Sequence, residues 1–445
     1  MLLSVLLLLL MVSWTEAAYT GTVFTHTAKD VQGSSFTFVR RIKLSFSSCA
    51  EGDSYLGSTN KIDESSGEWC LKEHTWKFTD QNLDYRCEWW TPPTWVNNSN
   101  GVSTFKFRII YELKKRSDIN RPNSSPQTGI IPLIRVPSNC QRDINLLTFD
   151  PDGDNVQCRY GSNPSDYECY ICTAPSVLSV SSACSLSFSP TSSSNEGSYA
   201  VQLMMEDFPR WSITLTRSDG STYSWSPSNF MTQISVQFVF KVDPAAPSCT
   251  AGEYLPRFLP PTPEHGAQFF IDLNETIEIS IRAEATQSVI TGIQFSGPFN
   301  MVKSSSGSGY FTLRWTPSFG QNNDDESHPV CFAVQATASS SVYQSELRCV
   351  IVTVSNIPFI VTPSPPPKTS VTPTTVALPL TTTSPPPKTS HVKVVKLKIK
   401  TSMSLKDKQD ELEKAIQDQL ITGGLPADIK VHLLSFGIAN KTAAP

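Results

Sequence analysis

The sequence predicts a mainly β protein of tandem β-sandwich modules, and three observations favour this fold class. The chain of 445 residues has 33 Pro and only 17% charged residues, a composition more typical of turns and extended segments than of helices. Short stretches of alternating apolar and polar residues recur along it, with turn residues between them. Two similar tetrapeptides, at 137–140 and 246–249, lie 109 positions apart and each open a new run of predicted strands. That spacing is typical of β-sandwich modules.

Residues 1–17 have the pattern of a secretory signal peptide. An apolar run extends to Val12, and the small residue Ala17 closes the segment. Beyond it, no apolar run approaches the roughly 20 residues that a membrane-spanning helix needs. We therefore expect a secreted, extracellular protein without a membrane span, unless the chain is a truncated form of an anchored one. The net charge of −4 provides no basic field for nucleic acid, so we expect no nucleic-acid partner.

Residues 19–138 are predicted to form an N-terminal β module. Apolar and polar residues alternate at 36–39 and again at 104–111, as they do in strands with one buried face. The basic run at 114–116 is expected at the solvated end of a hairpin.

Residues 139–245 and 246–358 are predicted to form two β-sandwich modules. The acidic-x-x-Tyr-x-Val pattern at 196–201 indicates a tyrosine corner, in which the Tyr hydroxyl bonds to an upstream backbone group. Every second residue of 277–283 is apolar, which predicts a strand with one buried face. An Ala-Val-Gln tripeptide before the final strand of both modules favours distant repeats.

Residues 359–390 are expected to form a disordered, mucin-like Pro/Thr/Ser stalk. The heptapeptide Ser-Pro-Pro-Pro-Lys-Thr-Ser occurs twice in it, so the stalk should be extended and O-glycosylated. Residues 391–445 are predicted to form a small β-α-β segment. It resembles part of a SEA domain but lacks that domain's cleavage motif. Because so short a segment buries little apolar surface, we expect it to be truncated or to self-associate.

Eleven cysteines in an exported chain predict a disulfide framework with one cysteine left over. Cys331 and Cys349 lie on what should be adjacent final strands, so we expect them to pair. Cys169 and Cys172 have CxxC spacing, but in this context structural disulfides are expected rather than zinc or redox chemistry. The unpaired cysteine would be free to join two chains. The pairing is left open for Cys49, Cys70, Cys87, Cys140, Cys158, Cys169, Cys172, Cys184 and Cys249.

An acidic turn at 150–154 is the candidate metal site. It places three carboxylates at alternate positions, and clustered hard oxygen donors are what Ca²⁺ needs. Two more carboxylates lie at the end of a neighbouring predicted strand. The alternative interpretation is a solvated Asp-Gly turn, with no cofactor in the protein. The five candidate ligands are Asp150, Asp152, Asp154, Glu206 and Asp207.

Two further sets of residues concern recognition and modification. The three tryptophans Trp89, Trp90 and Trp95 form either buried core or an exposed cluster that stacks a sugar ring or binds a protein. Sequons predict N-glycosylation at the surface. The four sequons are at Asn97, Asn123, Asn274 and Asn440.

The sequence contains no nucleophile elbow, zinc-protease pair or phosphate-binding loop, and its six His are scattered singly. We therefore predict no enzyme activity and no catalytic residue. An extracellular hydrolase is the alternative that these absences disfavour.

The stretch 147–160, L-T-F-D-P-D-G-D-N-V-Q-C-R-Y, resembles a group of animal extracellular proteins, well represented in fish, built from immunoglobulin-like or cadherin-like β modules. Their DPDGD-x-V-x-C-R pattern is followed by paired Cys and a Y-A-V strand, as here at 169–184 and 199–207. The stretch F-T-L-R-W-T-P at 311–317 is similar to the close of related modules. The resemblance covers about 19–354 and implies the fold, not a biochemical role. Related modules often carry Asp where this chain has 336–338, so calcium is not extended to the third module.

These features together predict a non-enzymatic secreted glycoprotein that acts in extracellular binding or in cell or matrix adhesion. The partner would be an extracellular protein or a glycan, and the alternative is a lectin-like protein that recognises carbohydrate or pathogen surfaces. Self-association is expected to use the C-terminal segment or the unpaired cysteine.

Overall fold

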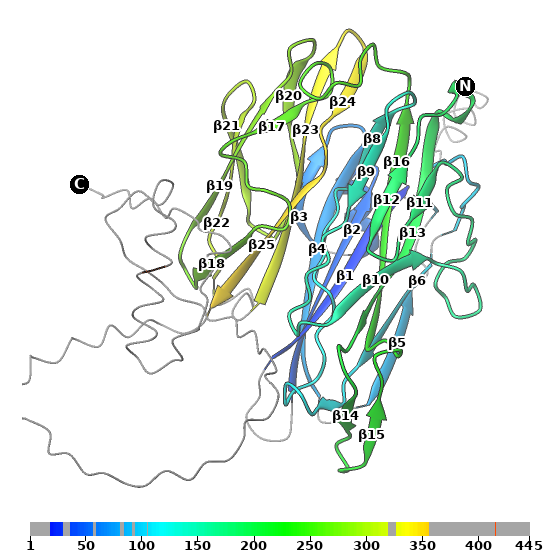
Figure 1. The fold of residues 1–445 in the computed structure, drawn as a ribbon, viewed down its shortest axis with the longest axis vertical. Helices are drawn as coiled ribbons and strands as arrows, with labels where there is room; N and C mark the ends of the chain where they lie inside the picture. Colours follow the sequence, from blue (N-terminus) through cyan, green and yellow to red (C-terminus); the bar gives the residue numbers. More distant parts are fainter. Residues whose placement is uncertain are drawn as a thin grey trace, which may run out of the picture. The chain divides into compact units, whose positions relative to one another are not determined.

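The computed structural model of this chain describes residues 18–29, 36–56, 59–80, 84–90, 94–104, 106–318 and 326–355, together with Lys414. All but Lys414 belong to one compact unit, 1–357, and Lys414 belongs to a second, 358–445. The predicted signal peptide, the stalk and the rest of the C-terminal segment lie outside the described residues. The first unit is mainly β, as predicted, and Figure 1 shows its strands.

The second predicted module is a sandwich of two sheets, called here the second sandwich. One sheet has the order β11-β12-β9, and the other contains the run β10-β13-β16, with β8 parallel to β16. The strands are β8 (Leu133–Pro137), β9 (Arg142–Asn145), β10 (Asn155–Tyr160), β11 (Leu178–Val180), β12 (Ser185–Phe188), β13 (Gly197–Phe208) and β16 (Thr232–Asp243), and the hairpin of β14 (Ile213–Thr216) and β15 (Thr222–Trp225) is inserted before β16.

The third predicted module, the third sandwich, repeats this strand order. Its sheets are β17-β19-β22-β21 and β18-β25-β23-β20, with β18 parallel to β25. The strands are β17 (Arg257–Leu259), β18 (Gln268–Asp272), β19 (Ile277–Glu284), β20 (Val289–Ser296), β21 (Val302–Gly307), β22 (Tyr310–Trp315), β23 (Glu326–Ala338), β24 (Ser341–Gln344) and β25 (Arg348–Ser355).

Both orders are those of an immunoglobulin-type sandwich, with strands B, E and D in one sheet and C, F and G in the other. The two copies of Ala-Val-Gln, at 200–202 and 333–335, lie on the corresponding F strands β13 and β23. In β19 buried residues alternate with exposed or half-buried ones, as predicted. The tyrosine corner is also present, because the Tyr199 hydroxyl donates to the Asn195 carbonyl at 2.9 Å.

Residues 18–132 are called here the N-terminal segment, and its described residues do not form a sandwich of their own. Strand β1 pairs with β16 through Thr22 and Val23, so the sheet of the second sandwich continues through β1-β2-β4-β3. The predicted boundary at 138/139 thus divides the chain but not the sheet. The segment contains β1 (Tyr19–Lys29), β2 (Phe36–Phe46), α2 (Cys49–Leu56), β3 (Asn60–Ser65), β4 (Trp69–Asp80), β5 (Tyr85–Trp90), β6 (Phe107–Glu112) and β7 (Lys115–Arg116).

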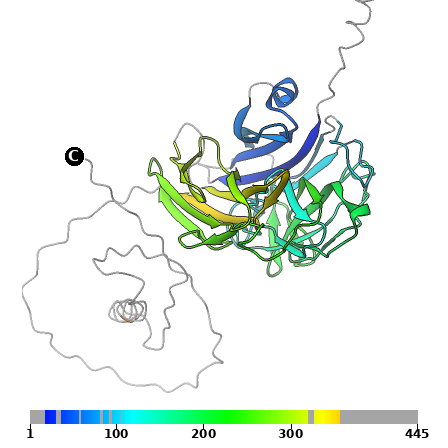
Figure 2. The same cartoon turned by 90° about the horizontal axis from the view of Figure 1, so that it is seen from above.

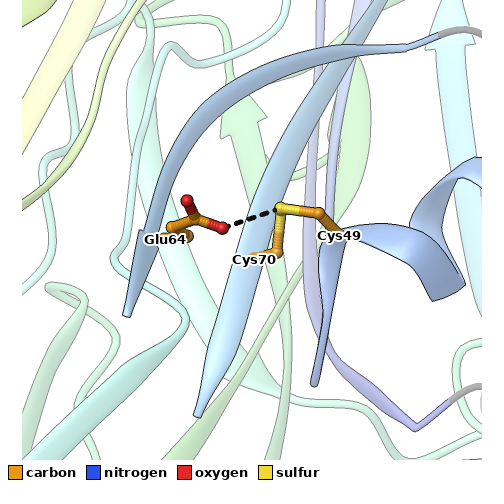
Figure 3. Close-up of side chains that lie close together, drawn as sticks. All are labelled: Cys49, Glu64 and Cys70. Carbon is orange, nitrogen blue, oxygen red and sulfur yellow. Dashed lines mark hydrogen bonds between the residues drawn. A yellow bond between two sulfur atoms is a disulfide. The ribbon is translucent and has the colours of Figure 1, made fainter. Parts of the chain in front are cut away.

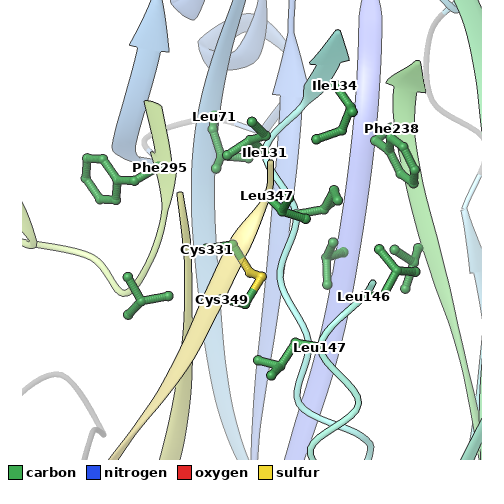
Figure 4. Packing of buried hydrophobic residues seen from close by; sticks show 14 of the residues in the cluster. Leu71, Ile131, Ile134, Leu146, Leu147, Phe238, Phe295, Cys331, Leu347 and Cys349 are labelled. Carbon is green, nitrogen blue, oxygen red and sulfur yellow. A yellow bond between two sulfur atoms is a disulfide. The ribbon is translucent and has the colours of Figure 1, made fainter. Parts of the chain in front are cut away.

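This extended sheet is covered by the third sandwich. In Figure 2 the blue strands of the N-terminal segment lie between the yellow-green third sandwich and the cyan-green second sandwich. Leu71, Ile131 and Leu147 belong to one buried apolar cluster with the third sandwich's Cys331 and Cys349 (Figure 4). Ion pairs complete the contact, including Arg41 with Glu326 at 2.5 Å and Lys303 with Asp63 at 2.6 Å.

Ten of the eleven cysteines form disulfides, including the predicted pair Cys331–Cys349 on facing positions of β23 and β25. Cys140 and Cys249 join the two tetrapeptides that open the second and third predicted modules. The remaining pairs are Cys49–Cys70, Cys158–Cys184 and Cys169–Cys172, and the exposed Cys87 is free.

Candidate functional site

The acidic turn connects β9 to β10 and is shaped by its first carboxylate. Asp150 Oδ1 accepts the backbone N–H groups of Asp152 at 2.9 Å and Asp154 at 3.1 Å. Gly153 has a φ of 82°, a conformation that side chains other than glycine rarely adopt. The other oxygen, Asp150 Oδ2, is buried and has no hydrogen-bond partner among the described residues.

Asp207, at the end of β13, lies beside this turn. Its side chain is fully buried and accepts the Thr232 N–H at 2.5 Å and the Asn123 side-chain amide at 2.6 Å. One carboxylate oxygen from each of Asp150, Asp154 and Asp207 lies within 4.8 Å of the other two. These three side chains are called the acidic centre below.

The other two predicted ligands point elsewhere. Asp152 pairs with Arg121 at 2.7 Å and accepts the Ser124 N–H at 2.6 Å. Glu206 pairs with Arg159 at 2.9 Å on the opposite face of β13, because adjacent residues of a strand alternate between faces. Of the five candidate ligands, the structure therefore brings together Asp150, Asp154 and Asp207 and directs Asp152 and Glu206 away from them.

A buried guanidinium adjoins the acidic centre. Arg116 is 1% exposed and bonds to both oxygens of Asp154, with Nη2 2.8 Å from Oδ1, and to Asp118 at 2.7 Å. The expectation that the basic run at 114–116 is solvated is thus wrong for Arg116, and also for Lys114, which pairs with Glu112 at 3.0 Å. Both cationic side chains can be buried because carboxylates of the folded chain pair with them.

The charges around the acidic centre do not balance. Asp150 and Asp207 form no ion pair with a described residue. The nearby Arg116 pairs with Asp154 and Asp118, and Arg121 pairs with Asp152. Burial, together with the charges of Asp152 and Asp154, raises the pKa of Asp150 to about 8. Burial and the charge of Asp150 also raise the pKa of Asp207 well above its usual value.

Asn123, a predicted glycosylation site, lies in this buried network. It has no exposed surface, and its side-chain nitrogen donates to Asp207 and to Thr232 Oγ1. A glycan on that nitrogen cannot fit into this fold, so the prediction of a surface sequon is wrong here. Asn97 and Asn274 are exposed, whereas Asn440 lies outside the described residues.

A second group with metal-ligand residue types is Cys49, Glu64 and Cys70, in which the sulfur of Cys49 lies 3.1 Å from Glu64 Oε2 (Figure 3). The two cysteines form a disulfide and therefore offer no thiolate to a metal.

The three tryptophans do not form one cluster. Trp95 is buried against Tyr19, with ring centroids 4.7 Å apart, and Trp90 is half-buried against Trp76. Trp89 is 49% exposed and stacks on Tyr167, with centroids 4.5 Å apart and planes 11° apart.

Trp89 belongs to a group of aromatic side chains that we call the aromatic surface, made up of the exposed Tyr85, Trp89 and Tyr170 and the half-buried Tyr167. Lys106 Nζ lies 4.4 Å from the ring centroid of Tyr167 and 5.2 Å from that of Tyr170. The disulfide Cys169–Cys172 closes the loop beside these tyrosines. Sequence reasoning missed both tyrosines because they lie far from Trp89 along the chain, and only the CxxC motif marked their loop.

Comparisons with known proteins identify no family. No protein-family model matches the chain. The integrin beta-like protein A of Dictyostelium discoideum is 27% identical over 113 residues, which cover 25% of this chain and 5% of that protein, so this chain matches only a small part of its length. No described helix is long and apolar enough to cross a membrane.

Solved structures with some similarity are β proteins and an enzyme. They include titin domains Z1Z2 in complex with telethonin (12% identity, 53% of this chain, 99% of that chain, TM-score 0.17) and Drosophila N-cadherin EC1-4 (13%, 67% and 67%, 0.19). An endo-fucoidan hydrolase of glycoside hydrolase family 107 also matches (12%, 75% and 39%, 0.19). Such TM-scores support no argument, so the sandwich assignment rests on the strand order of the chain itself.

Proposed function

We propose that this chain is a non-enzymatic, secreted extracellular protein that binds a partner or mediates adhesion through the aromatic surface. The observation that carries the proposal is the exposure of Trp89 (49%) and Tyr170 (50%) beside Tyr167 and Lys106. Five disulfides and two immunoglobulin-type sandwiches support an extracellular setting.

The aromatic surface is held in place before a partner arrives. The ring of Trp89 is stacked on Tyr167, and Lys106 makes cation–π contacts with both tyrosines. Rings that are already ordered lose little conformational entropy on binding. Trp and Tyr are also the residues that most often dominate the binding energy of protein interfaces.

The proposed partner is an extracellular protein. A glycan is the second candidate, because the exposed ring of Trp89 offers a flat apolar face on which a sugar can stack. Self-association through the exposed Cys87 is part of the proposal and is tested by comparing the mass of the wild-type chain and Cys87→Ser without reductant.

The test measures binding of the full chain to cells, matrix proteins and a glycan array. We expect Trp89→Ala and Tyr170→Ala each to weaken binding by about tenfold or more, as removal of a hot-spot side chain does. Tyr310→Ala is the matched control, because Tyr310 is 46% exposed on the third sandwich. Equal binding by all three variants would overturn the role of the aromatic surface. Binding confined to the glycan array would select the lectin-like alternative.

A further inference from the structure

We infer that the acidic centre of Asp150, Asp154 and Asp207 is a calcium site that fastens the N-terminal segment to the second sandwich. This inference does not depend on the proposed function, because the acidic centre shares no residue with the aromatic surface.

The first argument is the arrangement of oxygen atoms. Ca²⁺ is bound by oxygens at about 2.3–2.6 Å, so ligand oxygens around one ion lie within roughly 5 Å of each other. The three carboxylates meet this condition, with one oxygen of each within 4.8 Å of the others. Asp150 and Asp154 lie in the turn before β10, and Asp207 lies at the end of β13, so folding brings together residues that are far apart in the sequence.

The second argument is the buried oxygen without a partner. Asp150 Oδ2 has no hydrogen bond among the described residues, although Oδ1 of the same side chain accepts two. Leaving a buried carboxylate oxygen unsatisfied is costly. A bound cation would satisfy this oxygen without disturbing the turn.

The third argument is the charge. Arg116 is occupied by Asp154 and Asp118, and Arg121 by Asp152, so Asp150 and Asp207 lack a cationic partner in the described structure. One divalent cation would compensate both carboxylates at once. Protonation of the two carboxyl groups is the competing solution, and the experiment below distinguishes the two.

The donor set favours calcium over other metals. The neighbouring Thr232 Oγ1, which accepts from the Asn123 side-chain nitrogen, is also an oxygen atom, and no described His or Cys belongs to the group. Zinc prefers nitrogen and sulfur ligands, and Mg²⁺ requires a regular octahedron and usually keeps several waters. An irregular set of carboxylates, two of them buried and one half-buried, fits Ca²⁺ better.

Binding would have a structural consequence. Asn123 bonds to Asp207, and the Ser124 N–H bonds to the Asp152 carboxylate of the acidic turn. Residues 116–125 of the N-terminal segment thus contact the acidic centre. An ion bound at the acidic centre would therefore stabilise the junction between the N-terminal segment and the second sandwich.

The experiment uses the full chain, freed of divalent ions with EDTA and then titrated with CaCl₂. We expect heat of binding in calorimetry and a rise in Tm of about 5 °C at calcium roughly 100-fold above Kd. Asp150→Asn keeps the oxygen that accepts the turn N–H groups but removes the charge. We expect its Tm in EDTA to equal or exceed that of the wild type, and its calcium-dependent rise to be lost. Asp207→Asn is a second variant with the same expected loss.

The matched control is Asp219→Asn, an exposed carboxylate in the turn between β14 and β15, which should keep the full calcium response. No heat and no Tm shift in the wild type would overturn the inference in favour of protonated carboxyl groups. An unchanged calcium response in Asp150→Asn and Asp207→Asn would place the ion elsewhere. An equal response to MgCl₂ would overturn the choice of calcium.

Discussion

The second and third sandwiches share one strand order but differ at one end. At this end, the connection between strands B and C lies beside the end of strand F, which is β13 in the second sandwich and β23 in the third. In the second sandwich this end holds the carboxylates of 150–154 and Asp207, partly unpaired and buried. In the third sandwich the B–C connection, 285–288, has only neutral side chains, and Ser288 and Thr286 donate to the backbone carbonyls of Tyr254 at 2.7 Å and Gly252 at 3.1 Å. The same topology is therefore compatible with a satisfied neutral end or a charged end that needs a partner.

The two sandwiches also differ in how they contact the N-terminal segment. The second extends its sheet edge to edge, through hydrogen bonding of β16 to β1 and β6. The third packs apolar side chains against the same sheet. The charged end of the second sandwich lies where that edge-to-edge junction is closed by residues 116–125, which favours a role for the charges in joining the segments.

The largest expected effect comes from removing the buried guanidinium of the second sandwich. Arg116→Met leaves Asp154 and Asp118 without their cation, and an uncompensated buried charge costs about 3–5 kcal/mol. The free energy of unfolding in denaturant should fall by that amount. Arg217→Met is the control, because its pair with Asp84 is exposed to solvent and should contribute little to stability. Equal losses for the two variants would refute the idea that the charged end is essential to the second sandwich.

The next effect compares the internal disulfides of the two sandwiches. Cys158–Cys184 closes a separation of 26 residues and Cys331–Cys349 one of 18. Replacing either pair by two alanines should cost about 2–4 kcal/mol, since loop entropy depends only weakly on length. Thermal unfolding of both double variants measures this. A cost near zero for either pair would show that its sandwich is held by the surrounding core instead.

The pH dependence of stability separates the charged end from the rest of the fold. Because the pKa of Asp150 is raised to about 8, the folded state binds its proton more tightly than the unfolded state. In EDTA, this contribution is fully present below about pH 4 and is lost as the pH rises through about 8. The loss from Asp150 between pH 6.5 and 8 should be on the order of 1–2 kcal/mol. The loss should be smaller in Asp150→Asn, in which the buried Asp207 is left with a raised pKa.

His26 contributes to the pH dependence of stability with the opposite sign. The stability measurement therefore starts at pH 6.5, above which the contribution of His26 is constant. Burial lowers the pKa of His26 to about 3, so its unfolded state binds protons more tightly. That contribution is lost as the pH falls below about 6.5 and is constant above it. A rise in stability between pH 6.5 and 8 in EDTA would contradict the assignment of Asp150.

The local features of both sandwiches were predictable from the sequence, and the long-range ones were not. The alternation at 277–283, the tyrosine corner and the pair Cys331–Cys349 depend on neighbouring residues or strands, so the sequence pattern predicts them. The pairing of Thr22 with Gln237 joins residues more than 200 positions apart, and no local pattern indicates it. The sequence likewise showed Arg116 only as part of a basic run, because the carboxylate that buries it, Asp154, comes from another strand connection.

The smallest expected effect concerns the tyrosine corner, which the third sandwich lacks at the matching position, Phe332. Tyr199→Phe removes the hydroxyl that donates to the Asn195 carbonyl, and such a hydrogen bond contributes about 0.5–1.5 kcal/mol. The control Tyr310→Phe, on the exposed side of β22, should change stability by less than about 0.5 kcal/mol. Both are measured as the free energy of unfolding in urea. If Tyr199→Phe lowers the free energy of unfolding no more than the control does, the third sandwich loses no stability by having Phe332 in place of the tyrosine. The charged end would then be the feature that distinguishes the stability of the two sandwiches.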